Sequence, residues 1–337
     1  MRVDRLLRRL TTSLVVVFGV VTLTFFAARV VPSDPAQLYA GPRASPSRVA
    51  EVRARFGLDR PLPEQYLRYV GGLLAGDFGD SFKSKRAVSD DLRIYLPATL
   101  ELVLAAYIVA VFFGIPLGVF AGVHSSGTFD RLGTVAAILG ASVPVFWLAL
   151  LAQQLFFNQL RWLPLNGRLA SDIAIARPII PRTGFHLVDA ALAGNWIAWC
   201  DALAHLALPA LVLAVYPLCI ILRMTRNAVV EALHEPYILA ARSRGLPGWL
   251  LLRRHVLRVA LLPVLTVTGL SFAYAITGSV LVELLFRWPG VGKYLTDAIV
   301  SRDFPPILAV TLVSTIIFVG VTAMVDLLRL VLDPRAR

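Results

Sequence analysis

Long apolar blocks recur along this sequence and constrain its fold more than any other feature. A stretch of about 20 apolar residues is the length that an α-helix needs to cross the hydrocarbon core of a bilayer. Six blocks reach this length: Leu10–Val31, Ala98–Val123, Leu132–Leu160, Leu203–Leu222, Leu261–Leu285 and Ile307–Leu328. The third is long enough that we expect it to tilt. The sequence therefore predicts an all-α, polytopic membrane protein with six transmembrane helices.

The composition agrees with a protein that lies mostly in a lipid bilayer. Of the 337 residues, 57% are hydrophobic and only 16% are charged, whereas about 25% of residues are charged in soluble domains. The net charge of +12 also occurs in proteins that bind nucleic acid. Here the lysines and arginines gather in particular loops between spans, which favours membrane topology and no nucleic-acid partner.

The distribution of charge among the loops predicts the orientation in the membrane. With the N-terminus inside, the cytoplasmic segments are 1–9, 124–131, 223–260 and 329–337, which carry fifteen lysines or arginines and five acids. Positive charge in short loops favours the cytoplasmic side, whereas long loops are translocated largely regardless of charge. We therefore expect both termini to be cytoplasmic and the first span to stay uncleaved.

The sequence divides into three parts at the ends of the first apolar block and of the loop that follows it. These are a cytoplasmic N-terminus with the first span (1–31), an extracytoplasmic insertion (32–96) and a five-span core (97–337) that contains the cytoplasmic loop 223–260.

Turn and cap signals predict two helices and a turn within the insertion. Ser45-Pro46 can start a helix that Gly57 ends, and Pro63 can start a second helix. Gly76-Asp77-Phe78-Gly79 is typical of a turn. The insertion is either a cap that packs on the spans or a surface that receives an extracytoplasmic partner.

Two glutamates, Glu101 and Glu283, lie within predicted spans. Ionisable residues are costly in hydrocarbon and often mark a pathway or a gate. By the span boundaries above, each glutamate lies near an outer end. We therefore expect solvated carboxylates at the membrane interface, with a pathway or gating role as the alternative.

Catalytic, nucleotide and metal sites find no support in the residue pattern. Pro289–Tyr294 is similar to part of a phosphate loop, but it lacks the first glycine and the final serine or threonine. The five histidines are scattered, and the two cysteines, Cys200 and Cys219, form no cluster with them. We predict that the chain is not an enzyme and binds no metal or cofactor itself.

The cytoplasmic stretch Glu231–Pro263 is rich in arginine and longer than a topology signal requires. It predicts a helix from about Glu235 to Arg244 that ends at Gly245, where a left-handed residue can turn the chain. Ala240 and Ala241 are small and permit close approach of another surface. From the residues alone, a topology signal and a docking element remain alternatives.

Short sequence blocks in a fixed order extend from the first span to the C-terminus. They are Val31–Pro35, Phe56–Pro61, Gly76–Ser81, Leu96–Leu102, Tyr237–Leu246, Phe286–Gly292 and Asp333–Arg335. Together they resemble the permease subunits of binding-protein-dependent ABC importers, in the dipeptide, oligopeptide and nickel branch. Segment Asn166–Ala204 resembles the dipeptide-type members more than the nickel-type ones. One departure is Leu239, which stands where the "EAA" loop of that family has its glutamate.

The resemblance implies a permease subunit of the bacterial plasma (inner) membrane that works within a larger complex. It implies a heterodimer with a second homologous permease, two ABC ATPase subunits that use ATP and Mg²⁺, and an extracytoplasmic substrate-binding protein. The residues implied to couple the chain to an ATPase are Glu235, Tyr237, Ala240, Ala241, Arg242, Gly245 and Leu246. Those implied for the insertion and its docking are Asp34, Gly76, Asp77, Gly79 and Ser81.

The cargo implied by the resemblance is di- or oligopeptides, with nickel or another small solute as the alternative. A different class, the ion-coupled secondary transporter, predicts inverted repeats and acids at the membrane midplane. The sequence shows no clear repeat, and its acids lie at span ends. A structural or receptor protein would give the Glu231–Pro263 stretch no purpose.

Overall fold

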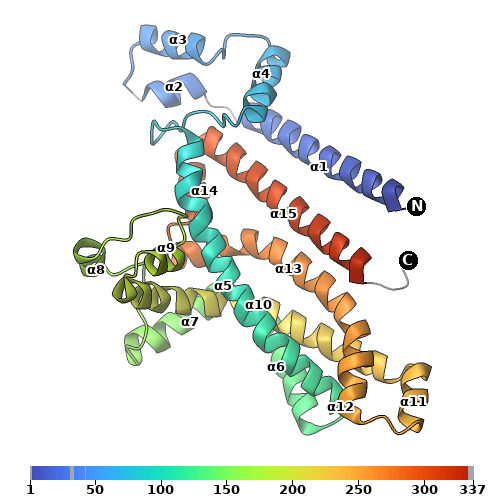
Figure 1. The fold of residues 1–337 in the computed structure, drawn as a ribbon. Helices are drawn as coiled ribbons and strands as arrows, with labels where there is room; N and C mark the ends of the chain where they lie inside the picture. Colours follow the sequence, from blue (N-terminus) through green and yellow to red (C-terminus); the bar gives the residue numbers. More distant parts are fainter. Residues whose placement is uncertain (1, 31–33, 42, 333–337) are drawn as a thin grey trace. The chain divides into compact units, whose positions relative to one another are not determined.

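The computed structural model describes residues 2–30, 34–41 and 43–332. The regular structure of these residues is helical, except for an isolated β-bridge between Asp80 and Ala87. Figure 1 shows the elements. In chain order they are α1 (Arg2–Val30), α2 (Pro35–Ala40), α3 (Pro46–Arg55), α4 (Leu62–Leu74), α5 (Val88–Val123), α6 (Thr128–Ser142), α7 (Val145–Ala152), the π-helical η1 (Gln153–Gln159), α8 (Ser171–Ala176), α9 (His186–Leu192), α10 (Trp196–Leu233), α11 (Pro236–Ser243), α12 (Gly248–Leu251), the π-helical η2 (Leu252–Val256), α13 (Leu257–Leu285), α14 (Val291–Ser301) and α15 (Phe304–Leu332).

Among the described residues, four continuous helices are long and apolar enough to cross a membrane. They span Val88–Val123, Trp196–Leu233, Gly248–Leu285 and Phe304–Arg329, and a fifth span results if α6 and α7 with η1 count as one. The described apolar part of α1, Thr11–Ala27, is shorter. The predicted class, an all-helical polytopic membrane protein, is confirmed at this level.

The third predicted span, Leu132–Leu160, is not a single tilted helix. Its two halves, α6 and α7 with η1, are bent by 101° at the break between them. Val143 there is extended, with φ −73° and ψ 127°. Because Pro144 follows it, the proline ring disfavours helical backbone at Val143 and supplies no N–H for a helical hydrogen bond. The proline therefore separates two helices where a tilt was expected.

The structure divides into two compact units. The first comprises Met1–Pro97 and Pro289–Val319, and the second comprises Ala98–Trp288 and Gly320–Arg337. The divisions fall inside α5, between α13 and α14, and inside α15. Each unit is described by itself.

The first unit confirms the two helices predicted for the insertion. The Ser45 hydroxyl accepts a hydrogen bond from the N–H of Arg48 (3.3 Å) and so caps α3, and Gly57 follows the helix with φ +62°. Pro63 lies in the first turn of α4. Helix α5, which contains the second predicted span, starts at Val88, upstream of the predicted Ala98. Its first turns pack in a core, where Val88 and Leu92 are buried against Val291 and Tyr294.

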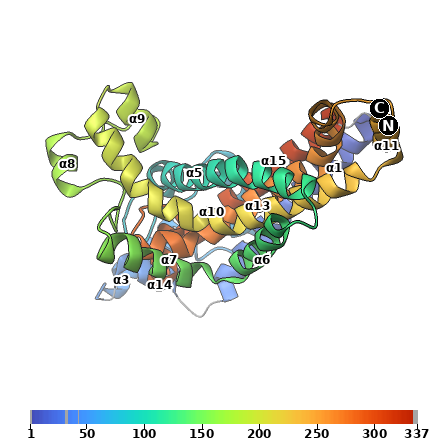
Figure 2. The ribbon, with the colours of Figure 1, turned by 90° about the horizontal axis from the view of Figure 1, so that it is seen from below.

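The second unit is built around α10, which packs against α13, α6 and α9 (Figure 2). Three glycines of α5, spaced four residues apart, face α10. A Cβ atom added at Gly118 would lie 2.6 Å from the carbonyl oxygen of Leu222, and one at Gly122 would lie 2.8 Å from the Val229 side chain. Small residues at this spacing let two membrane helices approach closely, and here they bring α5 against α10.

Candidate functional site

The helix α11 forms where the sequence predicts it. Glu235 precedes it with extended backbone, and Pro236 occupies the first turn, where the missing N–H would have no helical partner. The helix ends at Ser243, and Gly245 follows with φ +78°. The Gly245 N–H donates to the carbonyl of Arg242 at 3.0 Å. Both predicted ends of this helix are thus confirmed.

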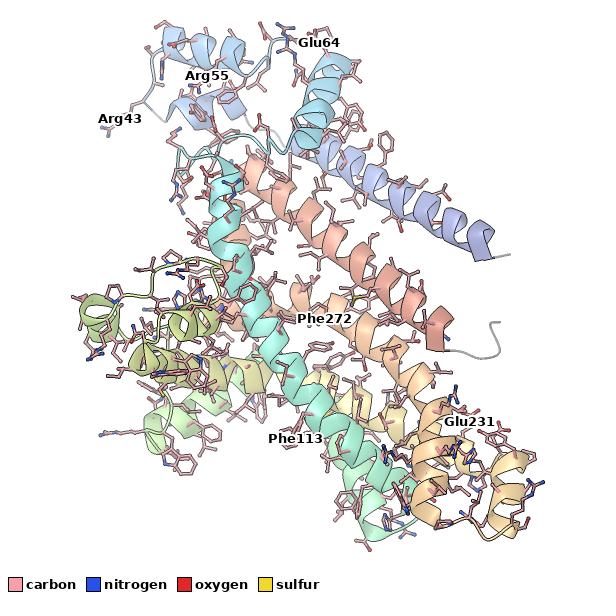
Figure 3. The ribbon with its side chains drawn as sticks, in the orientation of Figure 1. Arg43, Arg55, Glu64, Phe113, Glu231 and Phe272 are labelled. Atoms are coloured by element: carbon pink, nitrogen blue, oxygen red, sulfur yellow. The ribbon has the colours of Figure 1, made fainter. Side chains whose placement is uncertain are left out.

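One face of α11 is anchored in an apolar core. Ile238 is fully buried in a cluster with residues of α10, including Val229, and with Val256 of η2. Ala241, one turn later on the same side, packs against this cluster. The helix is therefore fixed to the end of α10 and to the segment that leads into α13. Glu231, labelled in Figure 3, lies in the last turns of α10.

The other face of α11 is open. Leu239 and Tyr237 expose 54% and 38% of their surface, and Ala240 and Arg242 are also exposed. Leu239 therefore presents an apolar side chain at the position where the EAA loop of the permease family has its glutamate. Gly245 is exposed and Leu246 is half-buried. An exposed surface with leucine, tyrosine and alanine on a short anchored helix is suited to contact another protein.

Glu101 is buried rather than solvated. Only 6% of its surface is exposed. Its carboxylate accepts hydrogen bonds from Nη2 of Arg168 (2.5 Å) and from the N–H of Leu187 (2.9 Å). Arg168, itself 8% exposed, also donates to the carbonyl of Gly184. The expectation of a solvated carboxylate at Glu101 was wrong, because the segment around Arg168 and Leu187 folds over this end of α5.

Glu283 is buried as well. None of its surface is exposed, and its Oε1 accepts hydrogen bonds from the hydroxyls of Thr99 (2.7 Å) and Ser279 (3.0 Å). The solvated expectation was wrong here too, because α5 covers this part of α13. A pathway or gating role for Glu101 and Glu283 stays a prediction.

Asp189 organises the loop before α9. Its carboxylate accepts hydrogen bonds from the N–H groups of Arg182, Thr183 and Gly184 (2.9–3.1 Å) and from the Thr183 hydroxyl (2.8 Å). Burial raises the pKa of Asp189, but these hydrogen bonds outweigh it and hold the pKa below its ordinary value. This role of Asp189 was not predicted from the sequence, where an aspartate a few residues after Thr183-Gly184 was the available signal.

His186 makes the second unit sensitive to acid. Burial, reinforced by the positive charge of Arg168, lowers the pKa of His186 to about 4, against about 6.5 in an unfolded chain. Between these values the unfolded chain binds a proton that the folded one excludes. Stability from this group is thus complete above about pH 6.5 and is lost as the pH falls toward 4.

We expect the protein to melt at a lower temperature at about pH 4.5 than at about pH 7.5. In His186→Gln the difference between these two melting temperatures should be smaller. An equal pH dependence in both proteins would contradict this assignment.

The predicted insertion residues lie in the first unit, and several of them shape its loops. Asp34 caps α2 by accepting from the N–H of Ala36 (3.0 Å) and pairs with Arg53. Gly76 and Gly79 have φ +79° and +81°, and the Asp77 carboxylate accepts from the N–H of Gly79 at 2.8 Å. The predicted turn is thus confirmed.

Ser81 is held by an aspartate whose role was not predicted from the sequence. Ser81 is 1% exposed and donates to Asp303 at 2.6 Å. The Asp303 carboxylate, 2% exposed, also accepts from the N–H groups of Phe82 and Lys83 (2.9 and 3.1 Å). The buried carboxylate before α15 thereby fixes the loop that follows the turn. Within the described residues, no group of three or more His, Cys, Asp or Glu side chains is placed to hold a metal ion.

Comparison with known protein families assigns nearly the whole chain. Residues 114–337 match the family described as binding-protein-dependent transport system inner membrane component. Residues 2–103 match the N-terminal region of such membrane components. The chain therefore belongs to the family of binding-protein-dependent transport system inner membrane components. It is a multi-pass permease subunit of an ABC importer and has no catalytic activity of its own.

Curated relatives align along almost their full lengths. The probable D,D-dipeptide transport system permease protein DdpB of Escherichia coli K12 is 43% identical over 320 residues, which cover 95% of this chain and 93% of the relative. The di/tripeptide transport system permease protein DppB of Pseudomonas aeruginosa UCBPP-PA14 is 42% identical, over 98% and 97%. The dipeptide transport system permease protein DppB of Escherichia coli K12 is 41% identical, over 98% of each chain. The family resemblance seen in the sequence is confirmed.

Proposed function

We propose that this chain is the permease subunit of an importer of di- and oligopeptides. It forms the translocation pathway together with a second, homologous permease. A substrate-binding protein delivers the peptide outside, and two ATPase subunits bind ATP and Mg²⁺ inside. The names of the relatives that are 41–43% identical, which refer to dipeptides or di/tripeptides, support this cargo.

The observation that carries the proposal is the two-sided character of α11. Ile238 and Ala241 attach the helix to an apolar core, whereas Tyr237, Leu239 and Ala240 remain exposed. We propose that this exposed face, with Arg242 and the turn at Gly245, lies in a groove of one ATPase. Closure of the ATPases then moves α11 and, through it, the membrane helices.

The proposed topology places six spans in the membrane with both termini in the cytoplasm. Helix α1 is the first span, and α6 with α7 and η1 forms a broken third span. The fifteen basic and five acidic residues of segments 1–9, 124–131, 223–260 and 329–337 support this orientation. The insertion 32–96 then lies outside, where its folded loops form a docking surface for the binding protein.

Replacing Gly245 with aspartate tests the coupling. We expect normal membrane insertion and continued ATP hydrolysis, but uptake of a radiolabelled dipeptide close to background. A Cβ at Gly245 meets nothing within 4 Å, so the chain itself has room for the side chain. The left-handed backbone and the new negative charge instead alter the docking turn.

Gly248→Asp is the matched control. It adds the same charge three residues later, at another position with nothing within 4 Å of the added Cβ and without a left-handed backbone. Undiminished uptake by Gly245→Asp would refute coupling through α11. Uptake of nickel without uptake of any peptide, measured with the cognate binding protein, would refute the cargo.

A further inference from the structure

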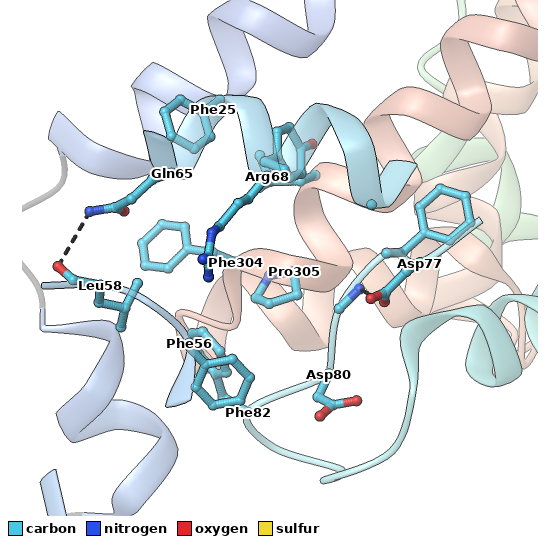
Figure 4. Close-up of a pocket in the computed structure, with 15 residues that line it drawn as sticks. Phe25, Phe56, Leu58, Gln65, Arg68, Asp77, Asp80, Phe82, Phe304 and Pro305 are labelled. Atoms are coloured by element: carbon cyan, nitrogen blue, oxygen red, sulfur yellow. Dashed lines mark hydrogen bonds between the residues drawn. The ribbon is translucent and has the colours of Figure 1, made fainter. Parts of the chain in front are cut away.

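A cavity of about 290 Å³ opens within the first unit (Figure 4). Its walls are mainly apolar and come from α1, the insertion and the start of α15: Phe25, Phe56, Phe82, Phe304, Pro305 and Leu308. This volume is close to the lower limit of pockets for small ligands, about 300 Å³. Aromatic and proline walls of this kind favour an apolar side chain as the occupant.

Arg68 of α4 brings a positive charge into the cavity. Figure 4 shows its side chain reaching between Phe304 and Pro305. Its guanidinium lies 3.6 Å from the Glu64 carboxylate, and Glu64 also pairs with Arg60. Because Glu64 is shared between two arginines, the guanidinium of Arg68 keeps donors for a carboxylate ligand.

Two carboxylates line another part of the same cavity. Asp77 uses Oδ1 to accept from Gly79, and Asp80 lies 3.9 Å from the guanidinium of Arg55. A carboxylate has about four acceptor positions, so both aspartates can accept further hydrogen bonds. The cavity therefore presents one positive and two negative groups beside apolar walls, which is complementary to a zwitterion with an apolar body.

Gln65 adds a demand for a hydrogen-bond donor. Its Nε2 donates to the carbonyls of Arg60 (2.7 Å) and Leu58 (3.3 Å), which fixes the orientation of the amide. The opposite atom, Oε1, is buried and has no hydrogen-bond partner among the described residues. Buried acceptors are nearly always satisfied, so an N–H group of a ligand would complete this site once the Gln65 side chain shifts enough to open Oε1 to the cavity.

We propose that this cavity is a binding site for a free short peptide that carries an apolar or aromatic side chain. The peptide carboxylate pairs with Arg68, an N–H group donates to Gln65, and the ammonium group pairs with Asp77 or Asp80. The side chain fills the space among Phe56, Phe82 and Phe304. The inference rests on the proposed peptide cargo, and it adds a peptide site on the permease itself, apart from the binding protein.

Equilibrium dialysis of radiolabelled Phe-Ala tests the site, with the complete transporter in nanodiscs and without the binding protein. We expect saturable binding that weakens about tenfold or more in Arg68→Gln, which loses a charge-assisted pair, and in Leu308→Trp, which fills the cavity. Arg48→Gln and Leu74→Trp are the matched controls, because both positions are exposed and lie outside the cavity. Ala-Ala is expected to bind more weakly than Phe-Ala.

Absence of saturable binding to the wild-type transporter, or equal binding by Arg68→Gln and Leu308→Trp, overturns the site. The site is also overturned if these two variants weaken binding of the substrate-binding protein but leave Phe-Ala binding unchanged. The cavity would then be part of the contact with that protein. Dipeptide uptake by the full system, measured in parallel, reports on the proposed function independently. Intact uptake without Phe-Ala binding removes the site and leaves the importer function standing.

Discussion

Replacing Arg168 with methionine is expected to destabilise the protein by about 3–5 kcal/mol, because it leaves the buried carboxylate of Glu101 without its cation. The side chains of this pair are only 7% and 6% exposed. The same arginine donates to Gly184, so the loop before α9 loses a contact too. A thermal melt of the detergent-purified protein measures the effect, and we expect a drop of many degrees together with loss of peptide uptake.

The double variant Glu101→Gln with Arg168→Met separates the charge from the packing. It removes both charges of the pair, so neither is left buried without its partner, and we expect it to be more stable than Arg168→Met alone. Arg177→Met is the control on the surface, because Arg177 is exposed. The role given to this pair would be contradicted if Arg168→Met had the same melting temperature as the wild type. It would also be contradicted if the double variant were less stable than Arg168→Met.

Replacing Gly118 with leucine is expected to force α5 away from α10. Already the first added atom, Cβ, would lie 2.6 Å from both the backbone oxygen of Leu222 and the Cβ of Thr225. Neither is the end of a flexible side chain, so a helix must move. Overpacking usually costs about 1–3 kcal/mol, and we expect this variant at or above the upper limit. Size-exclusion chromatography after a heating series reports the loss of folded protein.

Gly320→Leu provides the comparison for this experiment. Gly320 lies in α15, and a Cβ there meets nothing within 4 Å. The same leucine should be tolerated at Gly320, where helix propensity improves. If both variants retain the same fraction of folded protein after heating, the close packing of α5 on α10 does not limit stability.

Local signals made part of this structure predictable from the sequence. The proline at Pro236 and the left-handed glycine at Gly245 define both ends of α11, and the cap at Ser45 defines the start of α3. These features depend on residues within one or two turns. The family was also predictable, because its motifs occur in order along the whole chain.

The surroundings of the acids were not predictable, because their partners are distant in sequence. Arg168 lies 67 residues from Glu101, and Ser81 lies 222 residues from Asp303. Span boundaries indicate how deep a residue lies in the membrane but not which loop covers it. The break at Pro144 had a local signal, but a proline predicts a kink and not an angle of 101°.

The attachment of α11 has a mechanical consequence. The helix is joined by short connections to α10 on one side and to α12 on the other, and Ile238 is buried in one apolar cluster with Val229 and Val256. A load on the exposed face is therefore passed to α10 and to the base of α13 at the same time. We therefore expect α10 and α13 to move together at this end when the eight residues of α11, Pro236–Ser243, are displaced. The displacement would then reach the membrane helices directly and would not be lost in a flexible loop.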